Sequence, residues 1–576
     1  MMKINFKIAI IGLLGAVFIN TALAQADYQL DLPVGIPDPL STWTTEDYQG
    51  KSEDIVHPIT GVSPVSWVAA KNAGDPAYYI DNTSPNATNK NNEFGSPDLP
   101  RLSIPETTYE AGSYVEIHGG PYSGGGQIIF TAKGTPDKPV WIKGASFENM
   151  PEVTGETIIK GQYVFLENLK YTEIYESIQL RNHNSSMLHH VVIRNNIMKG
   201  TGAVAGRNAS AIIAYGYSDN RFHDIVIYNN DISYFGNSYS EDDPEAGITA
   251  ENDYHGIGIP SNVDRAWVLN NHIHHMGGDS IQVGTASTND KNRVENIYIG
   301  GNDFHNNLEN GVDVKEANNT LISTNKIYNF QIHKNNFSTG VAVVVHNGAY
   351  NTWLINNHIY NSGSAIEHTE GLDLWVVGNV IDSIQHPIWS GWDTESVYSR
   401  GAAVHVRGVS TGGILNNTIN NVDKGITLAT AGAFQVSNNS ISNRNEETGY
   451  DIHIESSNSE HVISNNLVYT PDFKVNFKNV ICDNCLFIEP SFINENYEIT
   501  NSAAGVASGV SLVTVQNKFK NSFGVELNKD ILGQERVKGT VDIGAIENQS
   551  SDAINNVIIE SPVAPSIDEI ILLNIE

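Results

Sequence analysis

A short phrase recurs along the chain and constrains its fold more than any other feature. Four clear copies read apolar, any, Asn, Asn, any, apolar, and they are Val268–Ile273, Leu354–Ile359, Ile414–Ile419 and Val436–Ile441. The marker asparagines are Asn196, Asn230, Asn271, Asn302, Asn325, Asn357, Asn379, Asn417, Asn439 and Asn466. Their separations run from 22 to 41 residues and the shortest cluster at 22–23, so the longer intervals read as the same unit with an inserted loop.

A repeat of about this length, made of short alternating segments, is typical of a solenoid. No segment carries a 3.6-residue period over three turns, which argues against helical and leucine-rich solenoids. Three short strands fit one 22-residue turn, and each marker Asn would stack on its equivalent in the next turn. The sequence therefore predicts an all-β chain folded as a right-handed parallel β-helix of about ten to thirteen coils, with a structural role for the asparagines.

The charge balance and the cysteine content exclude two classes of protein. The chain has 65 acidic and 33 basic residues, for a formal net charge of −32. This balance excludes nucleic acid as a partner, because nucleic-acid binding needs a basic face. Two cysteines in 576 residues exclude a disulfide scaffold, and we expect Cys482 and Cys485 to form a local disulfide.

The first 24 residues have the pattern of a secretory signal peptide. Lys3 and Lys7 precede a 12-residue apolar run, and Ala22-Leu23-Ala24 is a small-residue cleavage site. We therefore expect a secreted protein, extracellular or periplasmic, without a membrane span. We further expect an irregular cap over the open end of the core in residues 25–108, the β-helix in residues 109–547 and a tail in residues 548–576.

The flanks of the repeat region resemble a known class. Gly119-Gly120-Pro121-Tyr122 and Gly134–Val140 resemble the opening coil of secreted right-handed β-helix carbohydrate enzymes. Phe487-Ile488-Glu489-Pro490 and Val541–Glu547 resemble the way such helices close. The resemblance implies the same fold and an action on carbohydrate.

Aligning the strand of each coil places unusual polar residues on one outer strip, because strand side chains alternate between core and solvent. The predicted outward column is Gly258, Gln282, Asp313, Ala342, Glu367, His405 and Thr427, and a second column holds Lys315, His346, Thr369 and Arg407. We expect Glu367, His368, Trp389 and Trp392 to contact substrate, and Trp353 and Trp375 to pack within the fold. The alternative is an ordinary solvated face with scattered charges.

The segment Val312–Thr320 resembles the lysine-bearing coil of alginate lyases and chondroitinase B. In that family the next coil carries Arg-His-Gly, whereas here the matching stretch is Val345-His346-Asn347-Gly348. The resemblance implies a polysaccharide lyase with Lys315 as base and His346 or Arg407 in place of the missing arginine. If Lys315 is only a positive contact, the base is to be sought at His346 or His405. Asp279, Glu309 and Asp313 could hold a Ca²⁺ that neutralises the substrate carboxylate.

Two alternatives stay open. A glycoside hydrolase would need paired carboxylates, and Asp279 with Asp313, or Asp313 with Glu367, are the candidate pairs. A non-catalytic carbohydrate-binding or surface β-helix would not need the mixed acid, base and cation strip. The favoured interpretation is a monomeric lyase acting on an acidic, uronic-acid-containing polysaccharide.

Overall fold

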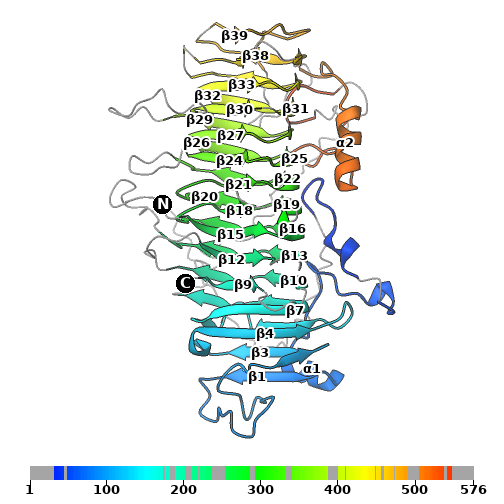
Figure 1. Ribbon diagram of the computed structural model, residues 1–576, viewed down its shortest axis with the longest axis vertical. Helices are drawn as coiled ribbons and strands as arrows, with labels where there is room; N and C mark the ends of the chain where they lie inside the picture. Colours follow the sequence, from blue (N-terminus) through cyan, green and yellow to red (C-terminus); the bar gives the residue numbers. More distant parts are fainter. Residues whose placement is uncertain are drawn as a thin grey trace, which may run out of the picture. The chain divides into compact units, whose positions relative to one another are not determined.

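A computed structural model describes residues 32–44, 48–172, 176–181, 188–200, 209–216, 221–236, 253–285, 292–331, 340–386, 400–408, 410–445, 447, 449–455, 460–472, 474–490, 505–536 and 541–547. Almost every element in these ranges is a β-strand, and the strands stack as parallel rungs (Figure 1). None of the helices in the described ranges has the length and apolar character needed to cross a membrane.

The strands form three parallel ladders, one on each face of every coil. Ladder A contains β2 (Thr108–Glu110), β4 (Gln127–Lys133), β7 (Glu156–Glu167), β9 (Ile178–Arg181), β12 (Ala209–Tyr215), β15 (Tyr254–Ser261), β18 (Ile281–Val283), β21 (Val312–Lys315), β24 (Val341–His346), β27 (Ser364–Thr369), β30 (Ala402–Gly408), β33 (Lys424–Thr430), β36 (Ile452–Ile454) and β39 (Phe477–Lys478).

Ladder B contains β1 (Ala77–Asp81), β3 (Tyr114–His118), β5 (Val140–Gly144), the same long strand β7, β10 (His189–Arg194), β13 (Phe222–Tyr228), β16 (Val263–Leu269), β19 (Glu295–Gly300), β22 (Asn318–Ser323), β25 (Tyr350–Ile355), β28 (Asp373–Val377), β31 (Thr411–Leu415), β34 (Phe434–Ser437) and β37 (Val462–Ser464). Because β7 pairs with strands of both ladders, A and B form one continuous sheet.

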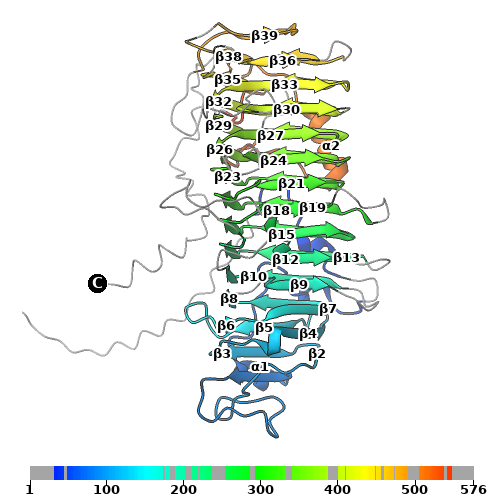
Figure 2. The same cartoon turned by 60° about the vertical axis from the view of Figure 1, so that its left-hand side comes forward.

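Ladder C is a separate sheet of 12 strands (Figure 2). It contains β6 (Glu152–Val153), β8 (Lys170–Thr172), β11 (Ile197–Lys199), β14 (Asp231–Ser233), β17 (His272–His274), β20 (Asp303–His305), β23 (Lys326–Tyr328), β26 (His358–Ser362), β29 (Val380–Ile384), β32 (Thr418–Val422), β35 (Ser440–Ser442) and β38 (Leu467–Tyr469). The fold is thus the predicted right-handed parallel β-helix, and its twelve strands in ladder C match the expected number of coils.

The marker asparagines form one continuous column at the turn between ladders B and C. All ten are linked from Asn196 to Asn466, each side-chain Nδ2 donating to Oδ1 of the next at 2.9–3.1 Å. The preceding residue turns the chain in a left-handed conformation, as Asn270 (φ 53°) and Asn356 (φ 52°) do, which asparagine tolerates. The predicted ladder is confirmed, and its amides satisfy one another in the dry interior.

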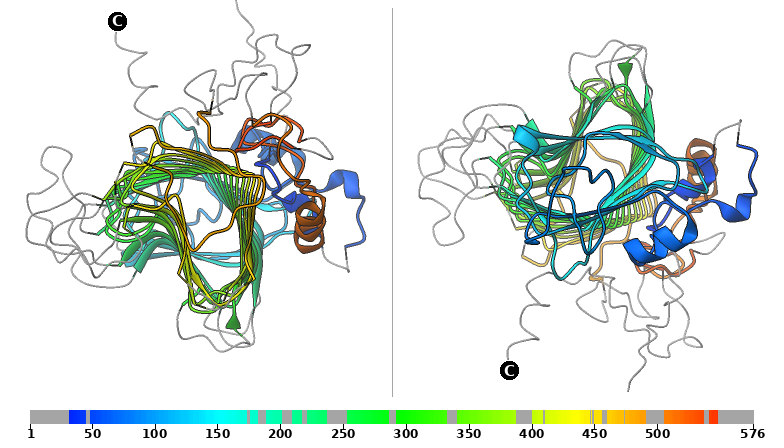
Figure 3. Two further views of the ribbon diagram at one scale, coloured as in Figure 1. Left: turned by 90° about the horizontal axis from the view of Figure 1, so that it is seen from above. Right: turned by 90° about the horizontal axis from the view of Figure 1, so that it is seen from below.

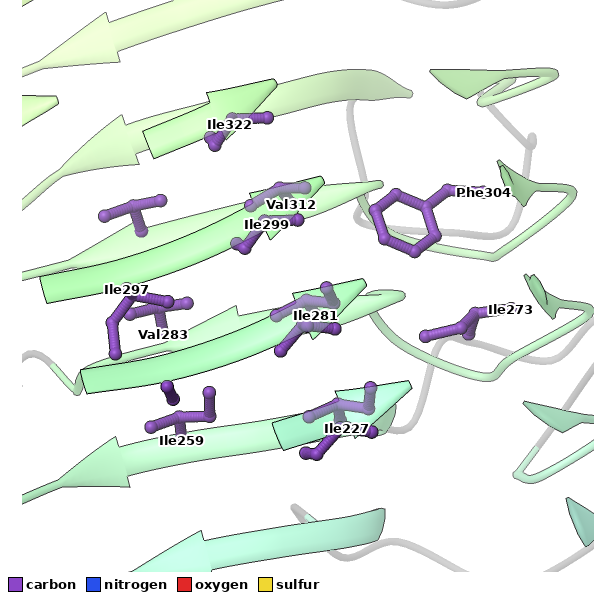
Figure 4. Close-up of a cluster of buried hydrophobic side chains, with 14 of the residues drawn as sticks. Ile227, Ile259, Ile273, Ile281, Val283, Ile297, Ile299, Phe304, Val312 and Ile322 are labelled. Atoms are coloured by element: carbon purple, nitrogen blue, oxygen red, sulfur yellow. The ribbon is translucent and has the colours of Figure 1, made fainter. Parts of the chain in front are cut away.

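The interior of the coils is filled by stacked aliphatic side chains. Figure 4 shows Ile259, Ile281, Val283, Val312 and Phe304 pointing inward from successive coils. Seen along the coil axis, the three ladders enclose this core (Figure 3). Since the inside is occupied, a ligand must bind on the outer surface.

The N-terminal segment does more than cap the core, which corrects the expectation for residues 25–108. Residues 32–44 and 48–66, here called the strap, run along the outside of ladder B (Figure 1). The strap accepts hydrogen bonds from alternate coils of ladder B: Ser323 donates to Val34 O, Trp267 to Pro37 O, and Arg194 to Ile59 O and Gly61 O. It includes the short 3₁₀ helices η1 (Pro39–Thr42) and η2 (Ser52–Asp54).

The end of the core is covered by the residues between the strap and the second coil. Helix α1 (Trp67–Ala73) contacts β1 and β3, and Phe94 and Ile104 pack against the first core residues. Strand β1, which falls inside the predicted cap, already belongs to the β-helix because it pairs with β3. A third 3₁₀ helix, η3 (Gly124–Gly126), precedes β4. The β-helix therefore begins at Ala77 rather than at residue 109 as the sequence predicts.

The C-terminal part folds back along the coils. Helix α2 (Val513–Phe523) places Phe519 with its ring centroid 5.1 Å from that of Trp353. The segment Val541–Glu547 resembles the closing end of a β-helix. It lies beside the asparagine turns, where Asn416 Nδ2 donates to Asp542 O at 2.8 Å. The core is closed by Phe477, Val480 and Cys482, and Cys482 forms the expected disulfide with Cys485.

Candidate active site

The outward strip predicted from sequence lies on ladder A, with one change of register. Asp313 pairs with Val344, so Val344 replaces Ala342 in the first column. The column then runs Gly258, Gln282, Asp313, Val344, Glu367, His405 and Thr427. Lys315 pairs directly with His346, and Thr369 and Arg407 follow in the second column. The predicted register of this strand was wrong because two small residues near its start, Gly340 and Ala342, fit the alignment equally well.

A compact acid–base group occupies the middle of this strip. Asp313 Oδ2 lies 2.7 Å from Lys315 Nζ, and Asp313 Oδ1 lies 2.7 Å from His346 Nε2. Lys315 and His346 are register neighbours in adjacent coils, about 4.8 Å apart along the stack. One buried carboxylate therefore holds two proton-carrying groups, which are themselves partly exposed, on the same outer face.

The electrostatics of the group follow from this contact. Burial alone would raise the pKa of Asp313, but the hydrogen bond from His346 and the charge of Lys315 outweigh it and lower the pKa. Burial alone would lower the pKa of Lys315, but the charge and hydrogen bond of Asp313, with the charges of Asp279 and Glu309, raise it. Lys315 is therefore a cation at neutral pH.

Two of the three predicted metal ligands come together beside Lys315. Asp279, Glu309 and His255 each offer a donor atom within 4.8 Å of the others. The main-chain amide of Asp279 donates to His255 Nδ1, so this nitrogen carries a lone pair, yet Asp279 Oδ2 lies 3.1 Å from it. Two lone-pair donors at this separation fit a shared cation. The third predicted ligand, Asp313, belongs instead to the group with Lys315 and His346.

The three residues offer two kinds of metal-ligating atom, carboxylate oxygen and imidazole nitrogen. Two carboxylates suit Ca²⁺, whereas the imidazole nitrogen suits Mn²⁺ or Zn²⁺ better. Asp279 is fully buried, and its Oδ1 accepts hydrogen bonds from the main-chain and side-chain amides of Asn310 at 3.0 and 2.9 Å. These bonds fix the carboxylate in place, as a ligand requires. The residues present thus fit a divalent cation, with Ca²⁺ as one candidate.

The other charged residues of the strip form a second group farther along. Arg407 Nη2 lies 2.5 Å from Glu367 Oε1, and His405 is the register neighbour of Glu367. Arg407 stands three coils from Lys315, about 14 Å along the stack. Burial lowers the pKa of His405 to about 4, so its imidazole is neutral. His405 and Arg407 are therefore not in contact with the lysine, contrary to the predicted catalytic set.

Three further expectations need correction or lie outside the structure. His368 aligns with Val345 and Val406, which face the core, and it is fully buried, so it does not contact a ligand on the strip. The carboxylate of Asp279 is fully buried rather than outward, and it aligns with Asn310 instead of Asp313. Trp389 and Trp392 lie outside the described residues.

The packing expected for Trp353 and Trp375 is confirmed. Their rings stack with centroids 5.0 Å apart, and Trp353 is fully buried beneath helix α2.

His255 was missed from the sequence because it stands just before the small residues used for alignment. Counting two positions back from the inward Ile257, Ile281 and Val312 would have aligned His255 with Asp279 and Asn310.

Comparison with known proteins adds similar solved structures but no family. No family model matches the chain, and no curated protein matches it. A PL6 family alginate lyase, AlyGC, is 15% identical with a TM-score of 0.47, covering 69% of this chain and 53% of its own. The chain thus spans about half the length of that lyase.

Other similar structures differ in activity. The pectate lyase Pel9A is 10% identical with a TM-score of 0.35, covering 83% of this chain and 98% of its own. The A-module of the mannuronan C-5 epimerase AlgE6 from Azotobacter vinelandii is 12% identical with a TM-score of 0.39, covering 66% and 92%. A GH136 lacto-N-biosidase from Eubacterium ramulus is 12% identical with a TM-score of 0.36, covering 73% and 69%.

Proposed function

We propose that the protein is a secreted polysaccharide lyase that cleaves a uronic-acid-containing polysaccharide by β-elimination on the outer face of ladder A. The observation that carries the proposal is the contact of Lys315 and His346 with opposite oxygens of the buried Asp313. β-Elimination needs a group that removes the C5 proton and a group that protonates the departing O4. Two neighbouring proton carriers on one outer face meet this requirement.

In the proposed reaction Lys315 takes the C5 proton and His346 gives a proton to the glycosidic oxygen. The C5 electron pair forms the C4–C5 double bond as the C4–O4 bond breaks, so the products are an unsaturated uronate and a new reducing end. Asp313 touches both side chains and fixes their positions. Arg407 and Glu367, three and two coils away, would contact sugars beyond the cleaved bond.

The base role of Lys315 depends on its charge environment. Asp313, Asp279 and Glu309 raise the pKa of Lys315. The amine then stays protonated at neutral pH, so it cannot accept the C5 proton. A divalent cation held by Asp279, Glu309 and His255 would supply positive charge that offsets the acids around Lys315. Chelator should therefore lower turnover, and added Ca²⁺ or Mn²⁺ should restore it. Full turnover in excess chelator would remove the cation from the mechanism.

The reaction type is tested on a panel of acidic polysaccharides that includes alginate, pectate and glycosaminoglycans. Absorbance near 232 nm and new reducing ends are followed together. Both signals rising in equal amount support the lyase. Reducing ends without absorbance would indicate hydrolysis by carboxylates such as Asp313 and Glu367, which stand two coils apart. Binding without either signal would indicate a non-catalytic module.

A further inference from the structure

A second cluster of titratable side chains lies on ladder C, away from the strip on ladder A. It is built on three consecutive strands, β14, β17 and β20, whose register places Asp231 beside His272 and His272 beside Asp303. In the neighbouring outward column His274 stands beside His305. His272, Asp303 and His305 each offer a donor atom within 4.8 Å of the others.

Hydrogen bonds fix which nitrogen of each ring carries the proton. His272 Nδ1 lies 3.0 Å from Asp231 Oδ2, and a carboxylate only accepts, so Nδ1 is the donor. His305 Nδ1 lies 3.2 Å from Asn306 Oδ1. That oxygen also accepts from Asn329 Nδ2 at 3.0 Å, so the Asn306 amide is oriented with its oxygen toward His305. Both rings therefore carry their lone pair on Nε2.

These two lone pairs face each other. His272 Nε2 and His305 Nε2 are 2.9 Å apart, which is repulsive for two acceptors unless a positive species lies between or beside them. Asp303 Oδ1, in the same group, is buried and has no hydrogen-bond partner among the described residues.

We infer that His272 Nε2, His305 Nε2 and Asp303 bind a divalent transition-metal ion such as Zn²⁺ on the outer face of ladder C. Two imidazoles and a carboxylate suit such ions, and further positions stay open to water. Zn–N bonds of about 2.0–2.1 Å place two tetrahedral ligand nitrogens about 3.3 Å apart, so the rings need to separate by only a few tenths of an ångström. Asp231 then serves as the outer carboxylate that orients a ligating histidine.

The other histidine clusters fit a metal less well. The group of His190, His223 and Asp224 is already bridged by Arg265, whose Nε and Nη2 donate to Asp224 at 2.8 and 3.0 Å. A guanidinium in that position takes the place of a cation. In the alternative set of Asp231, His272 and His274, the carboxylate of Asp231 already accepts the proton of His272 Nδ1 at 3.0 Å, so it is held by a hydrogen bond rather than left for a metal.

The inference is tested by calorimetric titration of the full chain with ZnCl₂ after chelator treatment and dialysis. An Asp279→Asn background removes the candidate cation site on ladder A, so the two sites are read separately. We expect one Zn²⁺ per chain and a raised Tm. His305→Gln and Asp303→Asn should each weaken binding by more than about 100-fold, and Asp231→Asn by about 10–100-fold.

Two matched variants complete the test. His358→Gln changes a histidine of the same outward column two coils beyond Asp303 and should leave the affinity unchanged. His274→Gln should also keep binding, because His274 belongs only to the alternative set. Absence of stoichiometric binding, or binding that survives Asp303→Asn but is lost in His274→Gln, would overturn the inference.

Discussion

The outer faces of ladders A and B are built from the same repeat and both carry ion pairs, but the face of ladder B also carries large aromatic side chains that other parts of the chain cover. Ladder B presents aromatic side chains outward, among them Trp141, Trp267 and Trp353, and the chain covers them with the strap and helix α2 (Figure 1). Ladder A presents Asp313 and Glu367 with their basic partners. An apolar outward column thus marks a face that the protein covers itself, whereas a mixed charged column marks a face suited to a ligand.

The largest effect on the covered face should come from Trp353→Ala. Trp353 is fully buried between Trp375 and Phe519 of helix α2, so truncation leaves a large cavity. We expect a loss of about 3–5 kcal/mol in the free energy of unfolding, measured by denaturant titration. Turnover per folded molecule should not change, because the residue lies on ladder B. A loss below about 1 kcal/mol would mean that α2 does not depend on this contact.

On the charged face, Asp313→Asn should lower turnover by about 10²-fold, equivalent to about 2.7 kcal/mol, with the fold intact. The pH profile separates a catalytic effect from a structural one. Asp313 holds the pKa of Lys315 above its usual range, so loss of the charge should lower that pKa and move the alkaline rise in kcat/KM to lower pH. A profile that keeps its position would contradict the link between the two residues.

The sequence predicted the coil, the asparagine column and the strip because each depends on residue type at a regular interval. Register across the loop before β24 could not be predicted, since small residues at Gly340 and Ala342 fit equally well. The aligned column already placed Arg407 three coils from Lys315, but the contact of Lys315 and His346 with one carboxylate of Asp313 depends on side-chain conformations that residue spacing does not give. The strap was misassigned because an irregular, proline-rich segment has no periodicity to show which face it covers.

Acid should loosen the strap where it crosses ladder B. Burial lowers the pKa of His190 to about 4 and that of His189 to about 3, and His190 Nε2 contacts Thr42 O of the strap at 2.9 Å. Both folded-state pKa values lie below the unfolded value of about 6.5, so their contribution is present above pH 6.5 and is lost as pH falls toward 4. We expect a loss on the order of 3 kcal/mol for each of the two histidines between pH 7 and pH 4.

Calorimetric Tm values at pH 7, 5 and 4 measure this loss. The variant His190→Gln serves as the comparison, because it removes one titrating imidazole and should flatten the pH dependence. A wild-type Tm that stays constant down to pH 4 would contradict the prediction, because it would mean that folding does not lower the pKa of these histidines.

The smallest effect should come from the ion pair that joins α2 to the covered face. Lys518 Nζ lies 2.9 Å from Asp373 Oδ2, and the Lys518 side chain is 41% exposed. Solvent screens such a pair, so Lys518→Ala should cost no more than about 1 kcal/mol. Thermal unfolding in low and high salt measures it. A cost equal to that of Trp353→Ala would mean that charge rather than aromatic packing holds α2.

The central claim is that Lys315 is the base on the ladder A strip, and Lys315→Arg tests it most directly. Arginine keeps a positive charge and can still contact Asp313, but it does not release its proton at any working pH. With Lys478→Ala, six coils away at the end of the same ladder, as control, we predict that Lys315→Arg lowers the rate of absorbance increase near 232 nm by about 10²–10⁴-fold, almost as much as Lys315→Ala. Near-normal turnover in Lys315→Arg would show that the residue is only a positive contact and would contradict the claim.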